Sequence, residues 1–226
     1  PEPMQDSSWR RAFVLTIPLL LGYTPLAIAY AVMWVQNGLP PLWALAASLF
    51  LYAGAMQFLL VGLLVSGVNP GAVALATLAV NLRLTFYGFI IPVAAYRGRP
   101  LQLAYSVHAL TDETYSLISQ LGDEATPQLI TRIELLAHTY WVSSTAIGLL
   151  LGQIIPPQIV GFEFALTALF LILAQNHCYH RERHRVQLYG LVATLIALAT
   201  VSDRNVLAVA IAILLVFLCI APPVRK

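Results

Sequence analysis

Long apolar stretches separated by short polar turns dominate this chain. Residues 12–82 contain no Asp, Glu, Lys or Arg, and further uncharged runs cover 84–96, 135–162, 164–180, 186–202 and 205–224. An α-helix needs about 20 apolar residues to cross a bilayer, so the longer runs can hold one or more crossings. Clusters of Gly, Pro and Asn, such as those at 37–41 and 66–71, divide the runs. The pattern predicts seven helical spans, at roughly 10–36, 42–66, 71–96, 131–155, 158–176, 186–202 and 205–221.

Residues 101–121 follow a different pattern. Leucine and valine side chains recur on one helical face, whereas His108, Asp112, Tyr115 and Ser119 fall near another face. The spacing predicts one amphipathic helix. Three placements fit it: an interfacial helix, a re-entrant segment, or an eighth span that faces the protein interior.

Composition fixes the class of protein. Hydrophobic residues make up 59% of the 226 residues and charged residues only 10%, compared with about 25% charged residues in a soluble domain. This composition excludes a soluble enzyme, a nucleic-acid-binding domain and a disordered chain. The uncharged runs are also too long, and alternate too little, for the strands of a membrane barrel. We therefore predict an all-α, polytopic membrane helical bundle of seven spans plus one amphipathic or re-entrant helix.

A faint internal similarity suggests a repeat. The stretch 27–57 resembles the stretch 146–175 in its Ala-Ile, Pro-Pro and Gln positions. If three spans separate the two copies, the repeat is inverted, as in many secondary transporters. We expect a single transmembrane transporter domain, 1–226, with possible repeat units 10–96 and 131–202.

The distribution of basic residues predicts the orientation. Arg181, Arg183 and Arg185 cluster in one loop, and Arg225 and Lys226 end the chain. Because positive loops stay on the cytoplasmic side, the C-terminus is expected in the cytoplasm. Seven spans would place the N-terminus outside and eight would place it inside. The sequence contains no Asn-x-Ser/Thr acceptor, which fits a bacterial inner membrane.

The first span contains Gly22, Tyr23, Thr24 and Pro25 in succession. Proline removes a backbone donor and collides with the preceding turn, and the adjacent glycine favours a break. A broken helix would expose backbone groups that a polar substrate could satisfy. The alternative is a plain kink. On the first reading, Tyr23, Thr24 and Pro25 belong to a substrate site.

The second span carries Gly54 and Gln57. Gly54 and its small neighbours allow close helix approach. Gln57 is an amide within an apolar segment, which predicts either an interhelical hydrogen bond or a substrate contact.

The third span holds Arg83 near mid-bilayer. A central Arg costs roughly 2.5–3.5 kcal/mol to insert, so its presence predicts a function. Tyr87 shares its face at i,i+4, and Asn81 stands two residues before it. Substrate binding, gating or a structural ion pair would each explain Arg83.

Acidic and imidazole groups supply candidate partners. Asp112 and Glu113 follow Thr111, and His108 stands four residues before Asp112. In a partly dry cavity these groups could carry protons or bind an ammonium group, and the alternative is a solvated loop or a helix cap. Glu134 and His138 are also at i,i+4, which favours a hydrogen-bonded pair.

Motifs for enzymatic chemistry are missing from the sequence. It has no zinc-protease His pair, no serine elbow and no phosphate-binding loop. We expect neither an enzyme nor a cofactor, a metal site or a nucleic-acid partner.

Four motifs resemble the AzlC family, the large subunit of branched-chain amino acid exporters. They are GYTPLAIA at 22–29, YAGAMQF at 52–58, NLR at 81–83 followed by Tyr87 and Gly88, and LTDE at 110–113, in the family's order. The resemblance covers most of the chain and is strongest over 10–120. It implies a bacterial inner-membrane transporter that works with a small membrane subunit of the AzlD type.

Together these features predict a secondary transporter that exports small or branched aliphatic amino acids, with ion or proton coupling. A zwitterion loses strong hydration in a bilayer, so the site must compensate both of its charges. The segment 23–25 and Arg83 would hold the carboxylate, His108, Asp112 or Glu113 the ammonium or a proton, and Gln57 and Asn81 would line the path. Met56 and Phe58 would contact the apolar side chain. The alternatives are a passive channel for small zwitterions, or a scaffold subunit that is active only with a partner.

Overall fold

The computed structural model describes residues 4–87, 90–156, 161, 164, 168, 171, 184–200 and 206–220, and every element within them is helical. Two compact units are formed, one by residues 1–67 with 81–166 and the other by 68–80 with 167–226. The expected span at 158–176 lies outside the described residues apart from four isolated positions. The predicted helical class is confirmed, whereas the number of spans and the inverted repeat remain predictions.

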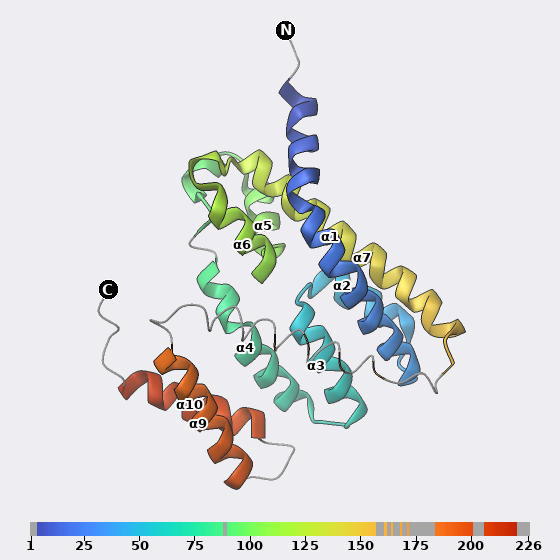
Figure 1. The fold of residues 1–226 in the computed structure, drawn as a ribbon, viewed down its shortest axis with the longest axis vertical. Helices are drawn as coiled ribbons and strands as arrows, with labels where there is room; N and C mark the ends of the chain where they lie inside the picture. Colours follow the sequence, from blue (N-terminus) through green and yellow to red (C-terminus); the bar gives the residue numbers. More distant parts are fainter. Residues whose placement is uncertain are drawn as a thin grey trace. The chain divides into compact units, whose positions relative to one another are not determined.

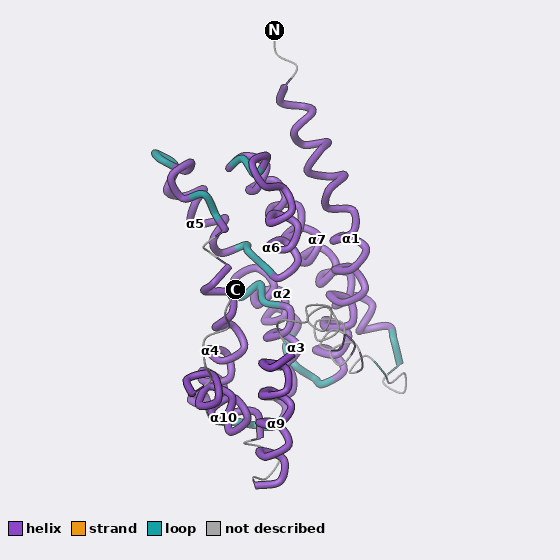
Figure 2. Tube along the Cα trace, turned by 60° about the vertical axis from the view of Figure 1, so that its left-hand side comes forward, coloured by secondary structure: helices purple, strands orange, loops and turns teal. Residues whose placement is uncertain are grey.

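Two long helices form the centre of the first unit. α1 (Met4–Gln36) and α7 (Pro127–Ile154) lie side by side along most of their lengths (Figures 1 and 2). By length and composition, Trp9–Gln36 and Pro127–Ile154 are the two described helices that could cross a membrane.

α1 and α7 run in the same direction. Near the middle of both helices the Thr16 and Tyr140 hydroxyls lie 3.1 Å apart. Further along, the Ser144 hydroxyl donates to Thr24 at 3.3 Å. The contacts therefore advance together along both helices. Consequently residues 37–126 must return the chain from the C-terminal end of α1 to the N-terminal end of α7.

Small residues let α1 and α7 approach closely. A Cβ added at Gly148 would lie 2.7 Å from the Cα of Ile28, and one at Gly152 would lie 3.0 Å from the Cβ of Val35. The two glycines form a GxxxG spacing, which suits close helix packing in a membrane.

The predicted break of the first helix is wrong. α1 continues as one helix through Pro18 and Pro25. Packing on α7 explains this, because Ala27, Tyr30 and Ala31 on the C-terminal side of Pro25 belong to the buried core that α7 also lines. The cost of one missing backbone bond is smaller than the packing that a break would remove.

The break occurs in the second segment instead. The expected span 42–66 forms two helices, α2 (Pro41–Phe50) and α3 (Gly54–Val65). Tyr52 lies between them with φ of 43°, the one non-glycine residue with positive φ among those described. Such a conformation is rare and persists when the surroundings impose it.

Residues 101–121 are also divided, so the single amphipathic helix is wrong. α5 (Pro100–His108) ends before Thr111, and α6 (Asp112–Leu121) begins there with a capping box between Thr111 and Thr114. A threonine side chain that bonds the first-turn backbone favours a new helix start over continuation. His108 and Asp112 therefore do not share one helical face.

The other described elements are shorter. α4 (Pro70–Tyr87) precedes a 3-10 turn η2 (Val93–Tyr96), and a 3-10 turn η3 (Gly122–Glu124) joins α6 to α7. In the second unit α9 (His184–Thr200) packs against α10 (Val206–Ile220), with the rings of Tyr189 and Phe217 5.8 Å apart.

The close approach of α1 and α7 gives a stability prediction. Gly148→Ala should destabilise the protein by about 1–3 kcal/mol, because the new methyl group meets the α1 backbone. Thermal unfolding in detergent measures the effect. Gly62→Ala is the matched control, since its added Cβ meets nothing within 4 Å. Equal melting temperatures for the two variants would contradict the packing account.

Candidate functional site

The two helix breaks lie around one buried group of residues. We call Tyr23, Tyr52, Gly54, Thr111, Glu113 and Trp141 the central cluster. They come from α1, from the α2–α3 break, from the α5–α6 break and from α7. Figure 1 shows the elements that supply them within the first unit.

Tyr23 connects α1 to the start of α6. Its hydroxyl lies 2.7 Å from the Thr111 hydroxyl and donates to the Glu113 carboxylate at 2.9 Å. Glu113 itself is partly buried beside Asp112, so an acidic side chain is held inside the unit by the Tyr23 hydroxyl. A carboxylate in this setting can bind a proton or an ammonium group.

Trp141 connects Tyr23 to the start of α3. The rings of Tyr23 and Trp141 meet edge to face at 5.4 Å. A Cβ added at Gly54 would lie 3.1 Å from the Trp141 ring, so a larger residue would require the indole to shift by a few tenths of an ångström. The first turn of α3 therefore lies against the same aromatic pair that reaches Glu113.

The α3 N-terminus offers backbone donors. No side chain caps it, and Ala53 precedes it with φ of −130°. The N–H groups of the first helical turn have no partner within a helix and carry a partial positive charge. They can hydrogen-bond a carboxylate.

Gln57 is committed to protein contacts. It is fully buried, its carbonyl oxygen accepts from the Trp141 indole at 2.9 Å, and its amide donates to Ser48 at 2.9 Å. Ser48 lies 2.9 Å from Thr145, which donates to the Trp141 carbonyl. This network holds Trp141 in place. Of the two predictions for Gln57, a substrate contact or an interhelical hydrogen bond, this conformation shows the hydrogen bond.

Tyr87 and Asp112 are brought together. The Tyr87 hydroxyl donates to Asp112 at 2.7 Å, and its ring stacks on Tyr115 at 4.3 Å. α4 thus meets α6 at the residues flanking Glu113. The side chain of Arg83, one turn before Tyr87 on α4, lies outside the described part of the structure, and Asn81 is partly buried.

Three other predicted site residues, on α1 and α5, are not members of the central cluster. Pro25 is exposed on α1, and Thr24 accepts from Ser144 of α7. His108 is exposed at the end of α5, and its ring meets that of His138 at 6.2 Å.

Glu134 and His138 do not form the predicted pair. The His138 ring nitrogens contact the Tyr105 hydroxyl at 3.2 Å and the Ser48 carbonyl at 3.3 Å, and neither Glu134 oxygen has a hydrogen-bond partner among the described residues. The α2 and α5 segments compete for the imidazole, which the spacing along α7 could not reveal.

Three members of the central cluster were missed by sequence reasoning, namely Tyr52, Thr111 as a hydrogen-bonding partner of Tyr23, and Trp141. A Thr-x-x-Thr pattern before an amphipathic run is a signal for the start of α6. The contacts of Tyr52 and Trp141 join segments more than 80 residues apart, so local patterns contain no signal for them.

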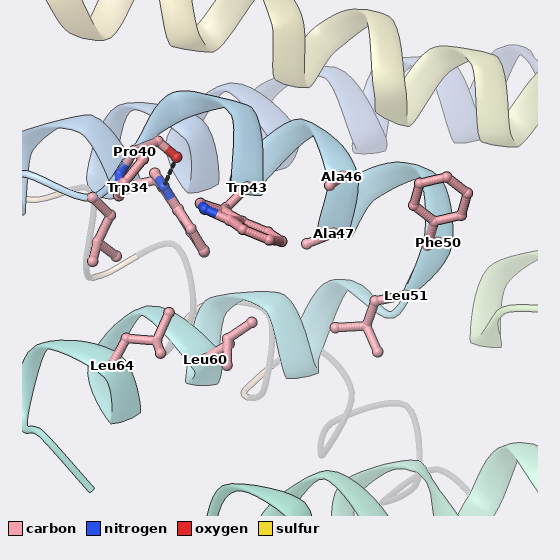
Figure 3. A pocket seen from close by; sticks show the side chains of 10 residues that line it. Trp34, Pro40, Trp43, Ala46, Ala47, Phe50, Leu51, Leu60 and Leu64 are labelled. Carbon is pink, nitrogen blue, oxygen red and sulfur yellow. Dashed lines mark hydrogen bonds between the residues drawn. The ribbon is translucent and has the colours of Figure 1, made fainter. Parts of the chain in front are cut away.

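A large apolar groove of the first unit lies elsewhere. It has a volume of about 610 Å³ and lies between α2 and α3, where Trp34, Trp43, Phe50 and Leu60 are among its lining residues (Figure 3). The Trp34 indole bonds to the Pro40 carbonyl at its edge. An open groove of apolar side chains offers nothing to a zwitterion and suits contact with lipid chains.

Comparison with known proteins supports the resemblance seen in the motifs. The chain is 31% identical to an uncharacterized membrane protein of Helicobacter pylori over 93% of each chain. It is 30% identical to the branched-chain amino acid transport protein AzlC of Bacillus subtilis, over 97% of this chain and 88% of the relative. It is 27% identical to the inner membrane protein YgaZ of Escherichia coli, over 69% of this chain and 67% of the relative. No solved structure matches the chain.

These relatives are named as membrane and transport proteins, in agreement with the long apolar helices α1 and α7. The sequence profile described as AzlC protein matches residues 18–155, which include α1, both helix breaks and α7. The chain is therefore a membrane protein of the AzlC family.

Proposed function

We propose that this protein is a secondary transporter that exports small or branched-chain aliphatic amino acids across the bacterial inner membrane, coupled to an ion or proton. The Bacillus subtilis relative is named for branched-chain amino acid transport, which suggests the substrate class. The observation that supports the proposal most is the meeting of two helix breaks around Tyr23. Broken helices at a buried site are a recurrent arrangement in secondary transporters.

The two breaks offer groups of opposite sign. The substrate carboxylate binds the first-turn N–H groups of α3, beside Gly54 and Tyr52. The ammonium binds Glu113, with Asp112 next to it, and displaces the Tyr23 hydroxyl. Arg83 keeps the role predicted from the sequence, that of a further partner for the substrate carboxylate. Both charges of the zwitterion thereby receive partners that substitute for lost hydration.

The site residues predicted from the sequence fall into two groups in this proposal. We propose that one group lies at or beside the substrate: Tyr23, Gly54, Tyr87, Asp112, Glu113 and Arg83. The other group supports the surrounding helices or lines the path: Thr24, Pro25, Gln57, Asn81 and His108. A small AzlD-like membrane subunit is the proposed partner, and residues 1–226 are the proposed single transmembrane domain.

The parallel course of α1 and α7 constrains the topology. If both helices span, residues 37–126 must cross an odd number of times. The segment 42–66 turns back on itself, because Leu64 of α3 and Pro40 before α2 line one groove, and Ser66 and Asn37 line one pocket.

The pair α5–α6 turns back as well, because Gln102 of α5 bonds Thr131 near the start of α7, and Leu121 of α6 packs beside Leu129. The segment 71–96 is therefore proposed as the crossing between α1 and α7. With three further predicted spans after α7 and a cytoplasmic C-terminus, the N-terminus then also lies in the cytoplasm.

Labelling tests this topology. In a variant with Cys178 and Cys219 replaced by serine, a cysteine placed by Asp123→Cys in η3 should react with an impermeant maleimide only from the cytoplasmic side. Ser66→Cys at the end of α3 should react only from outside, because α2–α3 turns back to the side where α1 ends. Both residues are exposed, so access does not limit the reaction. Labelling of Ser66→Cys from the cytoplasmic side, or of Asp123→Cys from outside, would contradict this topology.

Counterflow tests the transport proposal. Purified protein, reconstituted with and without the small subunit, should exchange labelled leucine, valine and alanine with saturable kinetics. Linear flux without saturation would instead indicate the passive channel. Absence of flux in both preparations would contradict transport by this chain.

Charge removal tests the site. Glu113→Gln keeps the shape of the side chain and removes its charge, so the KM for leucine counterflow should rise by about 10-fold to 100-fold, the equivalent of one charged hydrogen bond. Glu124→Gln is the matched control, since Glu124 is exposed and pairs with Arg11. An unchanged KM in Glu113→Gln would remove Glu113 from the substrate site.

A further inference from the structure

Glu134 is a buried acid without a visible partner. It lies on α7 with 0% of its surface exposed, and neither carboxylate oxygen accepts a hydrogen bond from any described residue. An ionised carboxylate in that position would be strongly unfavourable, because it has lost water without gaining a donor or a cation. Something must therefore neutralise it.

The Ser106 hydroxyl faces Glu134 and can serve as a hydrogen-bond acceptor. Ser106 of α5 lies opposite the carboxylate and 3.1 Å from the Thr131 hydroxyl. With the Thr131 proton donated to the Pro127 carbonyl at 2.9 Å, the Ser106 proton is donated to Thr131. Ser106 also accepts from the Tyr96 hydroxyl at 3.2 Å. One lone pair on Ser106 then remains, and a protonated Glu134 can donate to it.

His138 does not neutralise Glu134 either. Its Nε2 must donate to the Ser48 carbonyl, because a carbonyl only accepts. Its Nδ1 then accepts from the Tyr105 hydroxyl at 3.2 Å, so both bonds are satisfied by a neutral imidazole. The ring is held over Tyr52 at 4.2 Å.

Two described arginines of the neighbouring helices are engaged elsewhere. Arg11 of α1 pairs with Glu124, and Arg132 of α7 lies 5.0 Å over the Trp9 ring. The titratable groups on the elements around Glu134 are tyrosines, histidines and acids. They are Tyr23 of α1, Tyr52 before α3, Tyr96 of η2, Tyr105 and His108 of α5, Asp112 and Glu113 of α6, and His138 of α7.

We propose that Glu134 is the proton-binding carboxylate of this transporter and is protonated in the conformation described here. Release breaks the O–H bond of the carboxylic acid, passes the proton to water and leaves a carboxylate, which requires that water reach α7. Proton release is therefore tied to a conformation that opens the α5–α7 contact. The coupling role rests on the proposed transport function, whereas the proton site itself does not.

A sodium ion is the competing occupant and is less favourable. A bound cation needs several oxygen ligands. The Thr131 and Tyr105 oxygens are engaged in hydrogen bonds, which leaves one lone pair of Ser106 beside the carboxylate. The experiments below separate the two.

Infrared spectroscopy tests the protonation directly. The full-length protein in lipid should show the carbonyl stretching band of a protonated carboxylic acid, and Glu134→Gln should lack that band. Glu124→Gln should keep it, and Glu113→Gln identifies any contribution from the second internal acid. Ser106→Ala should shift the band, because it removes the acceptor of the acid proton. A band that is unaltered by Glu134→Gln, or one that sodium abolishes at constant pH, overturns the proposal.

Transport tests the coupling. Glu134→Gln mimics the protonated acid, so leucine counterflow should stay within about twofold of the unaltered protein, while accumulation driven by a pH gradient is lost. Retained accumulation overturns the coupling role. If the unaltered protein shows no counterflow but the infrared band behaves as expected, transport fails and the proton site stands.

Discussion

The structure depends on one constraint: a polar group inside an apolar interior must have a partner. Most internal polar groups of the first unit meet it within the protein. Gln57 is satisfied by Trp141 and Ser48, Tyr23 by Thr111 and Glu113, and the α6 N-terminus by its capping box. The exceptions are therefore informative. Among the residues that the structure describes, they include the Glu134 carboxylate, the Tyr52 hydroxyl and the uncapped start of α3.

The same constraint explains why a rigid pair of helices accompanies two broken ones. α1 and α7 pack along their lengths through Gly148 and Gly152, which gives the unit a fixed centre. The α2–α3 and α5–α6 breaks lie against that centre and present backbone ends and acidic side chains to it. A fixed pair of helices beside two broken segments suits a transporter. A charged substrate needs binding groups that come together in one conformation and separate in another.

Sequence patterns predicted the class of fold and the positions of α1, α7, α9 and α10. They failed where packing decides. Pro25 suggested a break, but burial of the adjoining α1 face against α7 keeps the helix whole. Tyr52 carries no breaking signal, yet the chain reverses its helical course there beside His138 and Trp141. Helical spacing also predicted a hydrogen bond between Glu134 and His138. The prediction failed because Tyr105 and Ser48, from segments distant in the sequence, bond the imidazole instead.

Competition by analogues that lack one charge is the most direct test of a site built for both charges of an amino acid. Binding of labelled leucine to the purified protein should be displaced by unlabelled leucine. Leucinamide, which lacks the carboxylate, and 4-methylpentanoate, which lacks the ammonium, should each compete at least about tenfold more weakly. Equal competition by either analogue would contradict the account.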